Sequence, residues 1–390
     1  MKNVTTTIDL NPIDRMISFL TMRYAFRYNT VLSCTDYRPV ALSADSFTPL
    51  DPRMLHRIIL EVQREGIEVS PNDIRNYIES DYVRQFDPVG DYLASCEGAW
   101  DGHDHIGDLA RTVPTDAPLW HKWFKTWLLA MVSQWQNQPS RLYGNSVAPS
   151  PQGYHKSTFC RQLLPDVLKW GYTDSLTLSD RRQVMLAMSQ QLLINLDEFN
   201  QISPRVQQGF LKNVIQLPSI KAKRPYGTHL EELPRKASFI ATSNMTDILS
   251  DPSGNRRFIG IELTAPIDTS RVPDHHQLFA QALQLLRNGS RSWFDKAETE
   301  QIMLWNRRYE IQEPADQYFS LCFSVADDPL DPAAEWLSTA EIFDVIKQKV
   351  GSSLQVNTLI AFGRKLANMP GMRRRKCETC TRYLVKRVGQ

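Results

Sequence analysis

The strongest constraint on the fold is an alternation of strand-like and helix-like segments that runs from about residue 140 to residue 263. Strands are predicted near Leu142–Ala148, at 171–178, and over the apolar runs QLLINLDEF, ASFIATSN and RRFIGIEL. Helical patterns lie between them at 157–169, 180–190 and 204–217. Strands that alternate with helices usually pair in parallel, so this region predicts an α/β domain built on a parallel sheet.

The composition is that of a globular protein without a strong overall charge. Hydrophobic residues make up 42% of the chain, and 45 basic residues face 43 acidic ones, so any nucleic-acid site must come from local clusters. No apolar run approaches the roughly 18 residues of a membrane helix, and the N-terminus lacks a signal-peptide core. Six scattered cysteines form no disulfide framework. We therefore expect a cytoplasmic protein with no membrane partner.

A segment at 150–165, SPQGYHKSTFCRQLLP, contains Lys156-Ser157-Thr158 ahead of a helix-like run. The pattern resembles the end of a phosphate-binding P-loop, G-x-x-x-x-G-K-[ST], in which the lysine reaches the phosphates and the hydroxyl reaches Mg²⁺. Ser150 and His155 stand where the two glycines belong. Alone, the segment is compatible with an ATP site, a decayed ATP site or a chance KST.

Three further elements follow in the order that a P-loop NTPase requires. The strand QLLINLDEF brings Asp197-Glu198, ASFIATSN ends in Asn244, and DPSGNRRF supplies Arg256 and Arg257. In such enzymes these positions hold Mg²⁺, orient the attacking water, contact the γ-phosphate and reach a neighbouring subunit's nucleotide. Each element alone is equally well explained as a capping pair or a solvated turn. Their order and spacing together favour a nucleotide site.

This series, with Ser243 beside Asn244 and the run Gly254–Phe258, resembles the virulence-associated E family. Members are P-loop ATPases of the superfamily 3 helicase type from phages, plasmids and integrated mobile elements. The upstream segments YNTVLSCTDYRP and FDPVGDYLASCEGAWDGHDHIGDLA resemble the helical part of that family, so the resemblance covers residues 25–310.

The resemblance implies an AAA+-like core that uses ATP and Mg²⁺ in an oligomeric ring, expected to be a hexamer, on single-stranded or forked DNA. It assigns the metal to Ser157 and Asp197, the catalytic base to Glu198, the polar sensor to Asn244, and the arginine finger to Arg257 or, alternatively, Arg256. The nucleotide would be bound by Gly153, Tyr154, His155, Lys156, Ser157 and Thr158. Residues 1–118 show no sign of the primase domain that many members carry, so any primase would be a separate partner.

The polar stretch SIKAKRPYGTHLEELPRKAS lies where superfamily 3 helicases insert a hairpin into the central channel. Lys221, Lys223 and Arg224 alternate with small residues, and Tyr226 is suited to stacking on a base, which is the composition of a strand-tracking loop. The alternative is an ordinary exposed hairpin.

The last part of the chain predicts two helices followed by a basic hairpin, a pattern typical of a winged helix. Arg373, Arg374 and Arg375 would then lie on a wing that contacts DNA phosphates, or else on a solvated edge strand whose charges prevent aggregation. We predict an α/β fold with three domains: a helical N-terminal domain (1–118), an AAA+-like P-loop ATPase domain (119–328) and a winged-helix-like domain (329–390).

Other candidate sites are weaker. The HDH sequence at 103–105 has the residue types of a metal site but no evident third ligand, and Cys377 and Cys380 form a C-x-x-C pair without the second pair that zinc requires. A surface turn and a hairpin turn explain them better. The tryptophans of LWHKWFKTWLLAMVSQW (119–135) have helical spacing and are expected in the core.

Three functions remain open at the level of sequence. The first is an ATP-dependent DNA helicase or translocase that replicates a mobile element. The second is an ATPase that loads or remodels replication proteins. The third is a non-hydrolysing DNA-binding replication or regulatory factor with a relic P-loop, because a Cβ at a position that needs φ > 0 costs about 1–2 kcal/mol.

Overall fold

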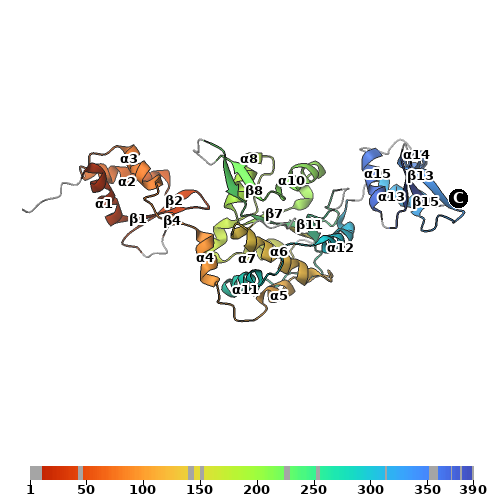
Figure 1. Cartoon of the computed structure of the whole chain (residues 1–390), viewed down its shortest axis with the longest axis horizontal. Helices are drawn as coiled ribbons and strands as arrows, with labels where there is room; N and C mark the ends of the chain where they lie inside the picture. Colours follow the sequence, from red (N-terminus) through yellow and green to blue (C-terminus); the bar gives the residue numbers. More distant parts are fainter. Residues whose placement is uncertain are drawn as a thin grey trace, which may run out of the picture.

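The computed structural model places the secondary structure in an N-terminal, a central and a C-terminal group, seen from left to right in Figure 1. It describes residues 11–42, 47–138, 145–149, 153–223, 229–251, 255–311, 314–350, 359–369, 371–377 and 380–388.

The N-terminal group packs three helices on a small sheet with strand order β3-β2-β1-β4. Each helix begins with a side-chain cap, Asn11, Asp51 or Ser70, followed by a proline that suits the first helical turn. The prediction of a mostly helical segment at 1–118 missed this sheet. The elements are α1 (Pro12–Arg23), β1 (Tyr24–Asn29), β2 (Cys34–Pro39), β3 (Thr48–Pro49), α2 (Pro52–Arg64), α3 (Pro71–Glu79) and β4 (Gln85–Phe86).

Two helices that precede residue 118 pack with the central group instead. Leu93 of α4 (Pro88–Cys96) and Ile106 of α5 (His105–Arg111) share one hydrophobic core with Trp123 and Phe279. These last two residues belong to α6 (Trp120–Trp135) and α11 (His275–Arg287). The predicted boundary at 118 therefore runs between elements that share a core.

The central sheet has the order β11-β5-β10-β7-β6, and every pair in it is parallel. The parallel sheet predicted from the alternating pattern is thus present. In chain order its strands are β5 (Asn145–Pro149), β6 (Tyr172–Thr173), β7 (Leu193–Leu196), β10 (Ser238–Ser243) and β11 (Phe258–Gly260).

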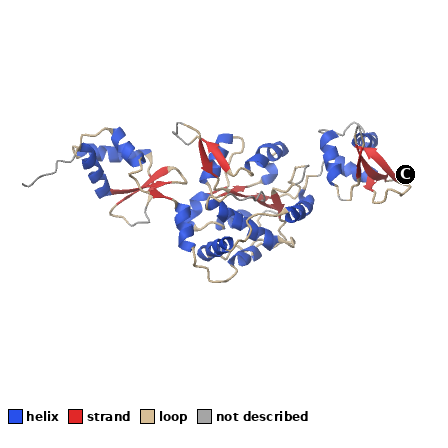
Figure 2. Ribbon diagram, viewed as in Figure 1, coloured by secondary structure: helices blue, strands red, loops and turns tan. Residues whose placement is uncertain are grey.

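Helices cover both faces of this sheet (Figure 2). Successive residues of a strand point to opposite faces, and accordingly Leu193 joins the core with α6 while Ile194 joins the opposite core. Trp123, Trp127 and Trp135 are almost fully buried, so the tryptophan-rich helix is a core element, as expected. The remaining helices are α7 (Lys156–Gln162), α8 (Arg181–Gln190), α12 (Lys296–Asn306) and the short 3-10 turns at 166–171, 199–201 and 307–309.

One helical segment between β7 and β10 is irregular. It consists of α9 (Pro204–Val206), a π-turn (Gln207–Leu211) and α10 (Lys212–Val214), and is called helix 204–214 below. An antiparallel hairpin follows it, formed by β8 (Ser219–Ala222) and β9 (Glu231–Pro234). The hairpin joins helix 204–214 to β10, so the predicted insertion before the Asn244 strand is indeed a hairpin.

The C-terminal group combines helices with an antiparallel sheet in which β12, β13 and β14 all pair with β15. Phe319 and Phe323 are buried against Ile342, Phe362 and Tyr383, so this core begins ahead of the boundary predicted at residue 329. The elements are α13 (Pro314–Cys322), β12 (Phe323–Val325), β13 (Ala334–Ser338), α14 (Thr339–Val350), α15 (Leu359–Asn368), β14 (Arg374–Lys376) and β15 (Thr381–Arg387).

A search of the described helices finds none that is both long enough and apolar enough to cross a membrane.

Candidate functional site

The predicted site residues follow three neighbouring strands of the central sheet. Lys156 begins α7 after β5, Asp197 and Glu198 follow β7, and Asn244 follows β10. Because β10 lies between β5 and β7 and all three are parallel, their carboxyl ends meet at one edge of the sheet. In open α/β sheets this edge is where ligands bind.

Hydrogen bonds join these strand ends directly. The Lys156 Nζ donates to the backbone oxygen of Ser243 at 2.8 Å and to the Asn244 Oδ1 at 2.9 Å. The ends of β10 and β7 are also joined, because the Thr242 hydroxyl donates to the Asp197 carboxylate. One cation, one carboxylate and one amide, which the sequence could relate only by their order, therefore lie together.

The Lys156 ammonium is half-buried, and this burial lowers its pKa, while the negative charge of Asp197 acts in the opposite direction. A cation that is partly removed from water interacts more strongly with an anion that approaches it. The arrangement is chemically suited to binding a phosphate group with a divalent cation beside it.

The loop before Lys156 has the backbone shape that glycine usually provides. Gly153 and His155 have φ of +86° and +59°, so the histidine at the second glycine position is in the left-handed region. Tyr154 packs on the core, and its backbone oxygen accepts from the Ile267 amide at 3.2 Å. Ser157 and Thr158 lie on the first turn of α7. Ser150 lies outside the described residues.

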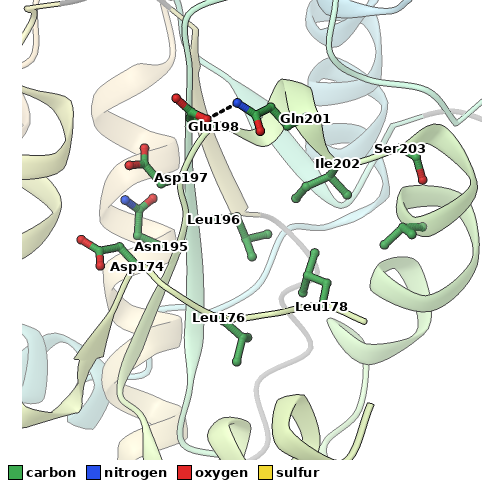
Figure 3. A pocket seen from close by; sticks show the side chains of 11 residues that line it. Asp174, Leu176, Leu178, Asn195, Leu196, Asp197, Glu198, Gln201, Ile202 and Ser203 are labelled. Atoms are coloured by element: carbon green, nitrogen blue, oxygen red, sulfur yellow. Dashed lines mark hydrogen bonds between the residues drawn. The ribbon is translucent and has the colours of Figure 1, made fainter. Parts of the chain in front are cut away.

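Glu198 is also in the left-handed region, with φ of +50°, and its carboxylate accepts a hydrogen bond from the Gln201 side chain. A cavity of about 570 Å³ opens beside it. In Figure 3, Asp174, Asn195 and Asp197 point to the left from neighbouring positions, while Leu178 and Ile202, which also line the cavity, lie to their right. The cavity thus joins the two carboxylates of the predicted pair to a third, Asp174.

Asn195 is a site residue that the sequence interpretation missed. It is 1% exposed, it lines the cavity, and neither polar atom of its amide has a hydrogen-bond partner in the described part of the chain. The buried hydroxyl of Tyr172 lies beside this amide and likewise lacks a hydrogen bond of normal geometry there, although the Asn195 amide lowers the pKa of the phenol against the effect of burial. Such groups are costly in a protein interior and are commonly found at functional sites. The available signal was a single amide within the apolar run 192–196.

The two arginines of the predicted finger have different surroundings. Arg257 is 9% exposed and forms an ion pair with Asp251 at 3.4 Å, and Asp251 also pairs with Lys212 at 2.6 Å. Arg256 is exposed. An arginine that acts on another subunit must be accessible, so this geometry favours Arg256, the alternative assignment, over Arg257.

The predicted DNA-contacting residues are exposed where they are described. Lys221 and Lys223 lie at the end of β8, and Lys221 faces Glu232 across the hairpin. Arg224 and Tyr226 lie outside the described residues. Arg374 and Arg375 are exposed on β14, Arg373 is exposed just before it, and the Arg375 guanidinium lies 5.1 Å from the ring centre of Trp336.

The weaker candidates have structural explanations. His103 pairs with Asp108 at 2.5 Å, and the hydrogen bond with this carboxylate raises the pKa of the exposed imidazole. His105 bonds to Asp101 at 3.0 Å. Cys377 and Cys380 flank a hairpin turn, and the amide of Cys377 donates to the oxygen of Cys380 at 2.8 Å. In the described residues no group of three or more acidic, histidine or cysteine side chains could hold a metal ion.

The fold and this strand-end site define an α/β protein with parallel and antiparallel sheets. The same fold is found in solved structures of the NrS-1 C-terminal region. The apo structure of its residues 305–718 is 12% identical, covers 97% of this chain and 99% of that chain, and has a TM-score of 0.50. An A-form apo structure of the same region gives the same identity and TM-score and is covered completely.

The sequence itself shows the family. The virulence-associated protein E-like domain matches residues 93–311, which is more than half of the chain and includes every strand of the central sheet. The protein therefore belongs to the virulence-associated protein E-like family. A comparison with curated proteins found no match.

Proposed function

We propose that this protein is an ATP-dependent DNA helicase or translocase that acts as an oligomeric ring in the replication of a mobile genetic element. The observation that carries the proposal is the meeting of Lys156, Asp197 and Asn244 at the adjoining ends of β5, β7 and β10. Family membership supports the association with replication of mobile elements.

The topology of the sheet supports a P-loop ATPase core of the AAA+-like class. If its strands are numbered in chain order, the spatial order is 5-1-4-3-2. The lysine then follows the first strand, the carboxylate pair the third, and the polar amide the fourth. This order supports the roles that the sequence motifs propose for these residues.

The residues present fit Mg²⁺-ATP, a ligand that supplies the phosphoryl group to be transferred. Ser157 and Asp197 would hold the metal, and Lys156 would bind the β- and γ-phosphates. Glu198 would accept a proton from the attacking water, and Asn244 would orient that water. In the structure Asp197 is already held by Thr242 and Lys156 by Asn244, so these groups need little reordering.

Two surfaces that carry exposed cations are suited to DNA. The β8–β9 hairpin carries Lys221 and Lys223 toward the end of β8, with Glu231 and Glu232 on the facing strand, and we infer that a strand in the ring channel would pass beside the two lysines. Apart from the additional strand β12, the C-terminal group follows the helix-strand-helix-helix-strand-strand order of a winged helix, and Arg373–Arg375 lie at its last hairpin. Arg256 would act as the finger on the neighbouring subunit's nucleotide.

A specific observation favours a second candidate, a DNA-binding replication factor that does not hydrolyse ATP. His155 places a Cβ in the left-handed region at the loop position where glycine is usual, a strain of about 1–2 kcal/mol. A protein that does not hydrolyse ATP would not need glycine at this loop position. The β8–β9 hairpin and the C-terminal wing could still bind DNA.

DNA-stimulated ATP hydrolysis by the purified protein tests the proposal. We expect Mg²⁺-dependent turnover that rises when single-stranded or forked DNA is added, and strand displacement on the forked substrate. Turnover without strand displacement would indicate a loading or remodelling ATPase. DNA binding without nucleotide binding would overturn the proposal in favour of the second candidate.

A further inference from the structure

Two adjacent basic residues at the base of the β8–β9 hairpin are buried. Arg235 and Lys236, which follow β9 directly, are 6% and 4% exposed. In the sequence they belong to the same basic stretch as Lys221 and Lys223, yet they cannot contact DNA. Their charges therefore serve a contact inside the protein.

Arg235 binds the carboxyl end of helix 204–214. Its Nη1 donates to the backbone oxygen of Ile215 and, at 3.4 Å, to that of Leu217, while its Nε donates to the oxygen of Ala237 at 2.8 Å. No described carboxylate forms an ion pair with it. Burial lowers the pKa of this guanidinium to about 10, so it is charged at neutral pH. A cation at a helix C-terminus is stabilised by the unpaired carbonyl groups there.

The opposite end of helix 204–214 adjoins the candidate nucleotide site. Only the 3-10 turn at 199–201 and two further residues separate it from Glu198, and Gln201 holds the Glu198 carboxylate. The helix is therefore tied to the carboxylates at one end and to the hairpin at the other.

The π-turn in the middle of helix 204–214 contacts Ser250, which lies a few residues before Arg256 and Arg257 in the chain. The Gln208 side chain donates to the Ser250 oxygen at 2.6 Å, and the Ser250 hydroxyl donates to Gln207 at 3.0 Å. Next to them Lys212 pairs with Asp251, the partner of Arg257. A π-turn is a rare irregularity that is concentrated at functional sites.

We propose that Arg235 is a positioning residue that fixes the β8–β9 hairpin to helix 204–214, so that displacements at the Asp197–Glu198 end of this helix move the DNA-contacting hairpin. The inference rests on the proposed function, because it assumes that the hairpin contacts DNA and that the carboxylates act on ATP. It adds a specific link between the candidate nucleotide site and the β8–β9 hairpin. Neither the P-loop motif nor the basic composition of the hairpin predicts this link.

Lys236 provides a matched control at the adjacent position. It is as deeply buried as Arg235, but its Nζ donates to the Trp135 oxygen at 2.6 Å and so binds the end of α6. Asp87 lines the same small cavity as Lys236. Helix α6 contacts the start of β7, where the Trp135 Nε1 donates to the Leu192 oxygen at 3.4 Å, whereas helix 204–214 begins beside the carboxylates at the other end of that strand. Loss of either cation should lower stability, whereas only loss of Arg235 should uncouple the two sites.

The test compares Arg235→Met, Arg235→Lys and Lys236→Met with the parent protein. Basal ATPase, ATPase with a saturating single-stranded oligonucleotide, and thermal unfolding are measured for each. We expect Arg235→Met to retain basal turnover and to lose about tenfold in the stimulation by DNA, the usual size of a coupling between two sites. Arg235→Lys should recover part of it, since one carbonyl remains within reach of a cation. Lys236→Met should keep the parent ratio.

Hydrogen exchange provides a measurement that does not depend on the stability of Arg235→Met. A non-hydrolysable ATP analogue should change the protection of the paired amides in β8 and β9 of the parent and of Lys236→Met, and change it less in Arg235→Lys. Analogue binding without any change in the parent hairpin, or full DNA stimulation in Arg235→Met, would overturn the inference and leave the proposed function standing. A parent protein that binds no nucleotide overturns both.

Discussion

The ammonium nitrogen of Lys156 lies 2.9 Å from the amide oxygen of Asn244, although 88 residues separate the two in the chain. The contact joins the loop after β5 to the end of β10 and brings the lysine beside the strand that carries Thr242, the partner of Asp197. A phosphate bound here would meet the cation and the amide together. The first prediction follows from this pairing.

Lys156→Ala should abolish ATP binding, because it removes the cation that faces the phosphates. Glu198→Gln should keep binding but block turnover, because an amide cannot accept the proton from water. Binding of a fluorescent ATP analogue and single-turnover hydrolysis distinguish the two effects. Hydrolysis by Lys156→Ala at the parent rate would show that the loop is not a nucleotide site.

His155→Gly should leave ATPase activity equal or higher and should stabilise the fold by about 0.5–1 kcal/mol, because it relieves a left-handed backbone while adding freedom to the unfolded chain. Asn137→Gly is the matched control, since Asn137 has φ of +60° outside the site and the short polar side chain of asparagine can stabilise this region by a local hydrogen bond. Denaturant unfolding measures both. A destabilised His155→Gly would mean that the imidazole makes a contact worth more than the strain.

The arginine pair should separate into a structural and a functional member. Arg257→Ala should destabilise the protein by about 2 kcal/mol through loss of the buried contact with Asp251, whereas Arg256→Ala should change stability by less than about 0.5 kcal/mol. Arg256→Ala should nevertheless lose ATPase activity. Thermal unfolding and steady-state hydrolysis give the two readouts.

A mixing experiment tests whether Arg256 acts across a subunit boundary. Arg256→Ala and Lys156→Ala should each be inactive, but their mixture should recover some turnover at interfaces that combine an intact loop with an intact finger. No recovery, together with a monomeric mass in the presence of ATP and DNA, would count against a ring.

The hairpin should contribute to the salt dependence of DNA binding. Replacing Lys221, Lys223 and Arg224 by Ala removes up to three phosphate contacts, so the slope of log K against log salt should flatten by up to about 2 for single strands. Unwinding should fall much further than basal ATPase. Fluorescence anisotropy across a salt series measures the slope.

A control for this variant removes three exposed charges from α2, namely Arg53, Arg57 and Arg64. It should leave the slope unchanged. An unaltered slope and normal unwinding in the hairpin variant would return this segment to an ordinary surface loop.

A deletion of the C-terminal group should give a well-behaved protein only if it removes the whole core of that group, which includes Phe319 and Phe323. Deletion of 329–390 leaves Phe319 and Phe323, which are 3% and 1% exposed in the intact fold, without the core that buries them. We expect that fragment to aggregate and to bind a hydrophobic dye. Deletion of 312–390 should remain monodisperse and retain basal ATPase while losing duplex affinity. Equal solubility of the two fragments would contradict this boundary.

The sequence predicted the central sheet, and it placed the polar residues of the candidate site at the ends of the strands, because both follow from local patterns. QLLINLDEF and ASFIATSN are short apolar runs that end in polar residues, a pattern typical of strands that are buried on both faces of a parallel sheet. The N-terminal sheet was missed for the opposite reason. Strands β1 and β2 carry charged and aromatic residues on an open sheet, and the turn between them reaches the left-handed region at Ser33 without a glycine.

Other features had no local signal at all. The burial of Arg235 depends on the helix end that folds against it, and a basic residue in a polar stretch is normally exposed. The π-turn at 207–211 has no sequence signature that separates it from an ordinary helix. The sequence did not indicate that the C-terminal core begins before residue 329. The proline-rich segment ADDPLDPAAE resembles a linker between domains, but it joins β12 to β13 within the C-terminal group.

The pairing of β15 with β12, β13 and β14 also has a consequence for how the chain folds during synthesis. The central sheet has all of its strands once Gly260 has left the ribosome, whereas β12 must wait for residues 381–387 before it gains its partner. At a translation rate of about 5–20 residues per second this takes about 3–12 seconds. During that interval the nascent C-terminal segment presents Phe319 and Phe323 to solvent, and we expect this to be the stage at which the growing chain most needs a chaperone.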